Sequence, residues 1–282
     1  MRPGELAELE REATPKGLDT TVPNMARMYD YFLGGKNNFA VDREAAEEVI
    51  KIGAQYGADV REVARANRAF VGRAVRFIAE SGVTQFLDIG AGLPTQENVH
   101  EIARRVTPDA RIVYVDNDPV VLTHARALLA DNPGTIAVDG DVTEPEAILN
   151  HPDVRAHLDL DRPFAILLTA ILHLFPDDAE VERMVAVLRR ALPPGGHLVI
   201  THAYTETPAV GRTEMGQAAQ VYRRTGSGLM TLRDAERVAV FFGDLELLEP
   251  GIVPVQYWRN DDPYIDPGLK PGGVLGGVAV AR

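Results

Sequence analysis

The segment Gln85–Pro94, with the sequence QFLDIGAGLP, constrains the fold of this chain more than any other feature. Its first residues are mostly apolar and predict a short buried strand, and the pattern of residues 96–106 predicts a helix soon after it. Gly90 and Gly92 lack Cβ atoms, so the backbone between strand and helix can turn tightly and lie directly against a ligand. A helix that begins there directs its free amide groups and its dipole toward the same place. The segment therefore predicts a ligand site at the carboxyl edge of a parallel sheet.

Strands and helices alternate after Thr84, which predicts one doubly wound α/β sheet with right-handed crossovers. Apolar runs such as residues 112–115 and 165–168 are typical of strands that are buried on both faces. At the C-terminal end two strands follow each other with no helix between them, and such neighbours pair antiparallel. We therefore predict a Rossmann-like, mostly parallel, seven-stranded sheet that ends in an antiparallel strand pair. The expected strands are Gln85–Ile89, Arg111–Asp116, Thr135–Asp139, Phe164–Thr169, His197–Ala203, one interrupted strand at Leu245–Leu248 and Ile252–Trp258, and Val274–Ala281.

Helices are expected both between these strands and before them. Asn24, Asp42 and Asp59 are each placed to cap one of three helices that precede the sheet. Between the strands, helices are predicted at 96–106, Pro119–Leu129, Glu144–Leu149 and Ala179–Leu192. We interpret the chain as a flexible arm (1–23), an N-terminal helical cap (24–82) and a Rossmann-like domain (83–282) with an inserted cap segment (205–230).

The composition excludes several classes of protein. The chain has 282 residues and no cysteine, which rules out disulfides, thiolate nucleophiles and cysteine-ligated metals. Its formal net charge of −12 argues against nucleic acid as a partner. No apolar run approaches the roughly 20 residues of a membrane span, and residues 1–21 lack the apolar core of a signal peptide. We expect a cytoplasmic protein with a small-molecule substrate and with neither a nucleic acid nor a membrane as partner.

Acidic residues lie at the ends of successive predicted strands. Asp88 precedes the glycine turn, Asp116 ends the second strand, and Asp141 follows the third. An acid at the end of the second strand can accept two hydrogen bonds from a ribose diol. Asp141 could accept from an adenine amino group while Val142 packs against the ring. Because the carboxyl ends of parallel strands meet at one edge, these groups predict a pocket for a nucleotide-like ligand.

Several of these motifs resemble those of the class I S-adenosylmethionine-dependent methyltransferases. The matching pieces are LDIGAG, the acid in VYVDND, DGDV, LLTAILHLF and LPPGGHLVI, which together with the terminal strand pair span residues 85–282. The segments MYDYFLGGKNNFAVDREAA, ANRAFVGRAVRFIAE and GLPTQENVHEIA resemble one bacterial group of this superfamily, the S-adenosyl methyltransferases that were long carried as a domain of unknown function. One departure is Pro94, which stands where superfamily members commonly have a third glycine. Proline removes an amide hydrogen but suits the first turn of a helix.

The resemblance implies a role for each part of the pocket. Gly90 and Gly92 would face the methionine end of S-adenosylmethionine, and Asp116 would bind its ribose hydroxyls. Asp141 and Val142 would hold the adenine, and the residues after the fourth strand would form the floor near the sulfonium. The expected cofactor-binding residues are Gly90, Gly92, Asp88, Asp116, Asn117, Asp141, Val142, Thr169, Ala170, Asn37, Asn38 and Arg68.

Some of these assignments have a plain structural alternative. Asn37 and Asn38 lie in a loop beside two glycines, where polar residues tend to carry function. Arg68 could bind the carboxylate of the cofactor, or it could form an ion pair on the acidic surface. His173 follows the fourth strand and could take a proton from a hydroxyl or amine of the acceptor, or it could shape the pocket by hydrogen bonding.

The acceptor side is the least defined by the sequence. Our candidates are Tyr31, Tyr204, Tyr222 and Trp258. Tyr31 could equally pack in the core of the helical cap, and Tyr222 could lie on a solvated helix face. The histidines show no metal-ligand spacing, so no metal site is expected.

Two other functions compete with methyl transfer. One is a regulatory protein that binds S-adenosylmethionine without using it. The other is a nicotinamide-dependent oxidoreductase, but its fingerprint requires glycine at the position of Thr95 and usually an apolar residue at the position of Asp88. A positively charged sulfonium also benefits from an acid-rich pocket. The sequence therefore favours a methyltransferase that uses S-adenosylmethionine.

Overall fold

The computed structural model describes residues 21–55, 57–94, 97–129, 132–204, 221, 230–260 and 273–282. Most of the expected N-terminal arm and of the inserted segment 205–230 lies outside these residues, so both remain predictions.

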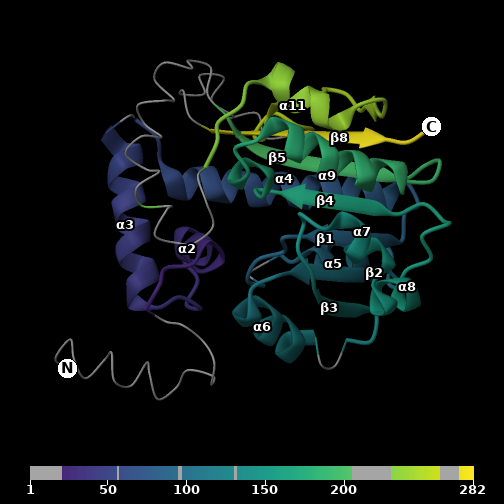
Figure 1. The fold of residues 1–282 in the computed structure, drawn as a ribbon, viewed down its shortest axis with the longest axis horizontal. Helices are drawn as coiled ribbons and strands as arrows, with labels where there is room; N and C mark the ends of the chain where they lie inside the picture. Colours follow the sequence, from purple (N-terminus) through teal and green to yellow (C-terminus); the bar gives the residue numbers. More distant parts are fainter. Residues whose placement is uncertain are drawn as a thin grey trace.

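A mixed β-sheet forms the centre of the molecule (Figure 1). The order of its strands is β3-β2-β1-β4-β5-β8-β6, and β7 also pairs with β8. Neighbours among β1 to β5 run parallel, whereas β8 runs antiparallel to β5, β6 and β7. Since β6 and β7 pair with successive parts of the same edge of β8, they occupy one position, which confirms the predicted fold. The interrupted strand is shorter than predicted, because residues 255–258 form turns. The strands are β1 (Gln85–Ile89), β2 (Arg111–Asp116), β3 (Thr135–Asp139), β4 (Ala165–Thr169), β5 (His197–Tyr204), β6 (Glu246–Leu247), β7 (Val253–Pro254) and β8 (Gly273–Val280).

Helices cover both faces of the sheet because successive strand residues point to opposite sides. On β1, Phe86 packs in one apolar cluster and Leu87 in the other. One face is covered by α4 (Val60–Glu80), α5 (Val99–Val106) and α6 (Pro119–Leu129). The other is covered by α7 (Pro145–Asn150), α8 (Pro152–His157), α9 (Asp178–Arg190) and α11 (Ala235–Phe242).

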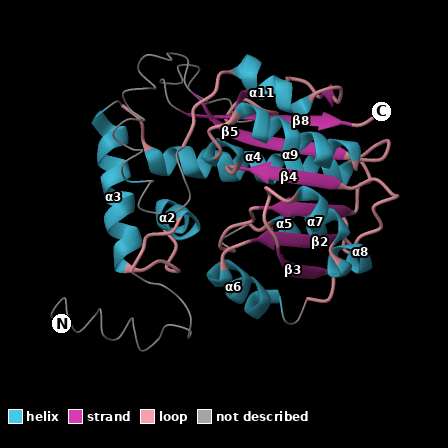
Figure 2. Ribbon diagram, viewed as in Figure 1, coloured by secondary structure: helices cyan, strands magenta, loops and turns pink. Residues whose placement is uncertain are grey.

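Two further helices, α2 (Met25–Phe32) and α3 (Ala40–Gln55), lie beyond the carboxyl ends of the parallel strands. The arrowheads of β1, β2 and β4 point toward them in Figure 2. With Ala64 of α4 and Val221, the two helices form a separate apolar cluster. The rest of α4, from Ala66 to Ala79, packs on the sheet. α4 therefore belongs to both the cap and the sheet layers, and it fixes one against the other.

The structure differs from the predicted helices at α3, α5 and α8. α3 begins at Ala40, so Asp42 lies in its first turn rather than at its N-cap. α5 begins at Val99 rather than at residue 96, because Asn98 and Glu101 form a capping box that starts the helix there. Its N-terminus is consequently farther along the chain from Gly92 than we expected. α8 was not predicted, and it begins at Pro152 directly after His151, whose ring accepts from the Asp153 amide at 3.2 Å.

Candidate active site

A cavity of about 620 Å³ lies between the carboxyl edge of the sheet and the helices α2, α3 and α4. Its size falls within the roughly 300–1,000 Å³ that ligand pockets commonly have. We call its two sides the strand-edge half and the helical half. The strand-edge half is lined by Gly90, Gly92, Asp116, Asn117, Asp141, Val142, Thr169 and Ala170. The helical half is lined by Met25, Phe32, Val49, Ile52, Val60, Val63, Met230 and Val274.

The two glycines of the turn after β1 are needed for different reasons. Gly90 has a φ of +74°, and a Cβ there would lie 2.2 Å from Cδ1 of Ile171. Gly92 has a φ of +66°, but a Cβ there would meet no atom within 4 Å. Both conformations favour glycine. Packing thus requires Gly90, whereas Gly92 borders open space in the cavity that a ligand could fill.

Asp116 is held rigidly at the end of β2. Its Oδ2 accepts from the Gly92 amide and its Oδ1 from the Asp118 amide, each at 2.9 Å. Burial raises the pKa of Asp116, and these two backbone hydrogen bonds oppose that rise. Asp118 in turn accepts from the side chain of Asn24, the N-cap residue of α2. One set of contacts therefore connects the glycine turn, the end of β2 and the covering helix.

Asp141 occupies the corresponding place after β3. Its Oδ1 accepts from the amide and the hydroxyl of Thr143, both at 2.8 Å, and its Oδ2 accepts from Asn117 at 3.1 Å. Partial burial raises the pKa of Asp141, but these hydrogen bonds outweigh it and the net pKa is lowered. Asp141 therefore stays charged, beside the buried Val142.

The floor of the cavity is formed where β4 ends. Thr169 is the last residue of the strand, and Ala170 has a φ of +57°, a region that residues other than glycine rarely adopt. The Ala170 amide donates to Oγ1 of Thr201 on the neighbouring β5 at 2.9 Å. Strained backbone of this kind is concentrated at functional sites. Here the turn carries the chain from the floor to His173.

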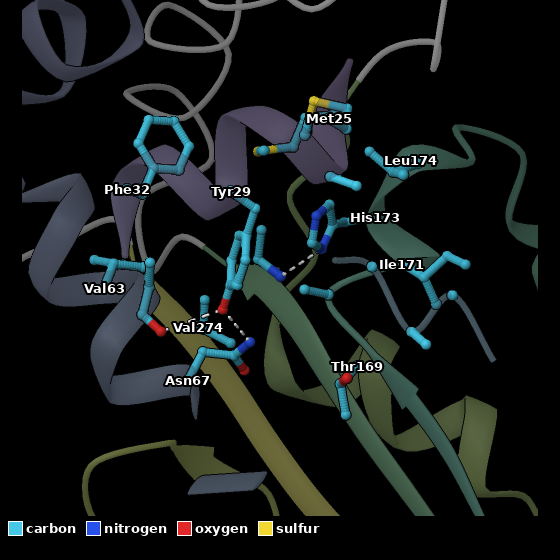
Figure 3. A pocket seen from close by; sticks show the side chains of 18 of the residues that line it. Met25, Tyr29, Phe32, Val63, Asn67, Thr169, Ile171, His173, Leu174 and Val274 are labelled. Atoms are coloured by element: carbon cyan, nitrogen blue, oxygen red, sulfur yellow. Dashed lines mark hydrogen bonds between the residues drawn. The ribbon is translucent and has the colours of Figure 1, made fainter. Parts of the chain in front are cut away.

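His173 lies in a single 3-10 turn, Leu172–Leu174, at the edge of the cavity. His173 is 5% exposed, and its Nδ1 accepts from the Ala203 amide at 3.4 Å (Figure 3). Burial, together with nearby His202 and Arg233, lowers the pKa of His173 to about 3. The ring is therefore neutral at physiological pH.

Asp88 does not line the main cavity, in contrast to our expectation for a residue that binds the cofactor directly. It is buried behind the glycine turn in a small separate space, which Arg68 and Asp116 also line. Its Oδ1 has no hydrogen-bond partner among the described residues. Burial raises the pKa of Asp88 to about 7, with Arg68 opposing and Asp116 adding to the rise. Arg68 lines both spaces.

The structure places the loop residues Asn37 and Asn38 away from the cavity wall. The side chain of Asn38 donates to Asp30 at 2.8 Å and to the Gly35 carbonyl at 3.0 Å. Asn37 donates its backbone amide to the same carboxylate at 2.9 Å, and its side chain is exposed. Their polar groups close the loop after α2 and hold Asp30, which itself lines the cavity. In contrast to our expectation, the structure therefore does not place this pair in the cavity lining.

Of the residues expected on the acceptor side, some line the cavity and others do not. Tyr204 lines the cavity at the end of β5. Tyr31 points away from it, because its hydroxyl donates to Glu47 at 2.7 Å. Trp258 is wholly buried in the core, with its ring edge-on to Phe70 at 5.4 Å. The placements expected for Tyr31 and Trp258 are therefore wrong, and Tyr222 lies outside the described residues.

Tyr29 and Asn67 line the cavity, although they are not among the residues predicted above. The Tyr29 hydroxyl donates to the Ala64 carbonyl at 3.2 Å and accepts from the Asn67 side chain at 2.9 Å (Figure 3). Of the two residues, Asn67 has the clearer sequence signal, because it is an amide among apolar residues of a predicted helix. In the structure it is only 3% exposed. The apolar wall of the helical half had no comparable signal.

The described residues hold neither a metal-binding cluster nor a membrane-spanning helix. No group of three or more histidine, cysteine, aspartate or glutamate side chains there is arranged to hold a metal ion. No helix in the described part of the chain combines the length and the apolar character that a bilayer crossing requires.

A glycine turn after β1, a mostly parallel sheet with antiparallel strands at its C-terminal end, and acids after β2 and β3 define a Rossmann-like methyltransferase fold. The chain belongs to the S-adenosyl methyltransferase family, whose pattern it matches over residues 11–282. None of the curated proteins compared with the chain matches it.

Solved structures agree with this family. A candidate methyltransferase from Thermobifida fusca YX is 44% identical, with a TM-score of 0.86 over 96% of this chain and 99% of that one. A DUF574 family protein from Streptomyces avermitilis MA-4680 is 38% identical, with a TM-score of 0.83 over 94% and 99%. The trans-methyltransferase CalH in complex with SAH is 13% identical, with a TM-score of 0.50 over 90% and 72%, and shares the fold alone.

Proposed function

We propose that the protein transfers a methyl group from S-adenosylmethionine to a small molecule. The observation that carries the proposal is the convergence of Gly92, Asp116 and Asp141, from three successive strand ends, on one cavity. Residues of the strand-edge half fit the cofactor. Asp116 would bind the ribose hydroxyls, Asp141 the adenine amino group, and the open space beside Gly92 the methionine part.

The charge of the site supports the same ligand. Asp116, Asp118 and Asp141 line the cavity, and a cationic sulfonium and ammonium are stabilised by nearby carboxylates. When bound, S-adenosylmethionine supplies an electrophilic methyl group. The protein's own contribution is to align the acceptor with it and to exclude water, which is where binding geometry lowers the barrier. The helical half is a concave, mostly apolar space rather than a flat surface, which supports a small-molecule acceptor.

The test is the affinity for S-adenosylmethionine and its demethylated product, measured by calorimetry. Asp116→Ala should weaken binding about 100-fold, because two hydrogen bonds to a charged group are lost at about 1.5 kcal/mol or more each. Tyr31→Phe is the matched control, since its side chain lies outside the cavity, and its affinity should equal that of the unaltered protein. A folded Asp116→Ala variant with unchanged affinity would contradict the proposal.

A second measurement separates transfer from binding alone. The protein is incubated with S-adenosylmethionine, with and without a cell metabolite extract. The demethylated product should be released only in the sample that contains the extract. Tight binding without such release would support the regulatory alternative. Binding of a nicotinamide dinucleotide in preference to S-adenosylmethionine would support the oxidoreductase.

A further inference from the structure

The helical half of the cavity is a carbon-lined chamber. Its walls come from α2, α3, α4 and the start of β8, and they present aliphatic, methionine and phenylalanine side chains. Among the described residues that line the whole cavity, Arg68 is the only lysine or arginine, and it also faces Asp88 behind the glycine turn. The Asp30 carboxylate at the chamber accepts from the loop amides of Asn37 and Asn38. An anionic molecule would thus lose its hydration here without gaining a counterion from the described residues of the helical half.

Tyr29 contributes a ring, not a reactive hydroxyl. Its hydroxyl already donates to the Ala64 carbonyl and accepts from Asn67, and burial raises its pKa. Figure 3 shows the ring extending from α2 into the cavity, between Val63 and His173. Tyr29 is therefore a fixed wall of the chamber and a poor proton acceptor.

The ring of His202 lies next to that of His173, and its own hydrogen-bond partners show which of its nitrogens carries the hydrogen. His202 accepts from Arg233 at 2.9 Å through Nε2, so its other ring nitrogen carries the hydrogen that it donates to the Ala203 carbonyl at 2.7 Å. Arg233 is held by Asp178 at 2.6 Å and by the Phe175 carbonyl at 2.8 Å.

Beside this neutral ring, Nδ1 of His173 accepts from the backbone amide of Ala203. The hydrogen of its neutral ring is therefore on Nε2, which has no partner in the described part of the chain. In Figure 3 that nitrogen lies on the side of the ring toward Tyr29 and Met25.

We infer that the methyl acceptor is an uncharged molecule with an apolar body that fills the helical half and an oxygen that accepts a hydrogen bond from Nε2 of His173. The inference rests on the proposed function and names its substrate class. The nucleophilic atom of the acceptor bonds to the methyl carbon as the C–S bond breaks, and sulfur keeps that electron pair. The methylated product keeps the acceptor's proton until it leaves the cavity and releases it to bulk water, because Nδ1 of His173 is occupied and Nε2 already carries a hydrogen.

The experiment uses the full chain loaded with the demethylated cofactor and three probes of matched shape. They are methyl naphthyl ketone, isopropenylnaphthalene, which lacks the oxygen, and naphthoate, which is anionic. Calorimetry should show the ketone binding about tenfold more tightly than the hydrocarbon, the value of one neutral hydrogen bond, and naphthoate binding most weakly. His173→Phe should abolish the preference for the ketone, whereas His173→Gln, which retains an N–H donor, should keep it.

A chamber variant and the cofactor itself complete the design. Ile52→Trp should block all three probes and leave the affinity for the demethylated cofactor unchanged, which also shows that the variant is folded. An unaltered preference in His173→Phe, tightest binding of naphthoate, or unchanged probe binding in Ile52→Trp would each overturn the inference. If the unaltered protein binds the demethylated cofactor but none of the three probes, the inference is overturned and the proposed function still stands. Failure to bind that cofactor would refute both.

Discussion

Asp88→Asn should stabilise the ligand-free protein, and the gain should grow as the pH rises. The Asp88 side chain is buried beside Asp116, one of its oxygens has no hydrogen-bond partner among the described residues, and burial raises its pKa to about 7. In the unfolded chain an aspartate titrates near pH 4. Asparagine has nearly the same shape and carries no charge that folding must bury.

The magnitude follows from proton linkage. Between about pH 4 and about pH 7 the folded protein holds a proton on Asp88 that the unfolded chain has lost. The folded state therefore binds more protons, and its stability falls as the pH rises, by about 1.4 kcal/mol for each pH unit. From pH 5 to pH 8 the loss is about 3 kcal/mol, or roughly 5 °C in Tm for a chain of 282 residues. Asp88→Asn has no carboxyl at this position, so it does not lose this part of its stability as the pH rises.

The assay is the Tm of both proteins, measured by calorimetry or circular dichroism at pH 5 and pH 8 without cofactor. The Tm of Asp88→Asn minus that of the unaltered protein should increase by about 5 °C between the two pH values. Asp139→Asn, which removes an exposed carboxyl at the same sheet edge, is measured at the same two pH values as the control. An Asp88→Asn difference that is the same at both pH values would refute the reasoning, since the buried carboxyl would then not retain its proton.

Two further predictions separate packing from binding. Gly90→Ala should destabilise the fold, because its Cβ would overlap Ile171, whereas Gly92→Ala should lose only about 1–2 kcal/mol of unfolding free energy and weaken cofactor binding by filling open space. Denaturant titration measures the stability of both variants, and calorimetry measures their affinity for the cofactor. Tight cofactor binding to Gly92→Ala would show that the cofactor lies elsewhere. Trp258→Ala should cost about 3–5 kcal/mol in unfolding free energy through lost packing on Phe70 and Phe77, with unchanged cofactor affinity in the folded fraction; an affinity loss without destabilisation would restore Trp258 as a binding residue.

The sheet and the strand-edge half could be predicted because they depend on local patterns and topology. Short apolar runs define β1 to β5, and parallel strands bring their carboxyl ends to one edge whatever the loops between them do. The positions of Asp116 and Asp141 then follow from their place just after a strand. Asp88 is the exception, because the strand turns its side chain toward the helices behind the sheet rather than into the cavity.

The helical half could not be predicted, because no local pattern distinguishes a cavity wall from a packed core. Tyr29 and Tyr31 are two positions apart on α2, so the helix turns them about 200° from each other and only one can face the sheet. Both are tyrosines, and the choice depends on tertiary partners, which are Asn67 for one and Glu47 for the other. Trp258 illustrates the same limit, since an aromatic residue near a strand end suits a core as well as a site.

The two halves of the cavity have separate structural origins, and this has a consequence for specificity. The strand-edge half depends on the sheet and its turns, whereas the helical half depends on how α2 and α3 sit on α4. Within the cap, the buried Arg27–Asp42 ion pair at 2.8 Å joins α2 to α3, and Asn24 contacts Asp118 after β2. Substitutions on the inner faces of α2 and α3 can therefore reshape the acceptor chamber without disturbing Asp116 or the glycine turn. In such an arrangement the cofactor site and the acceptor site can vary independently.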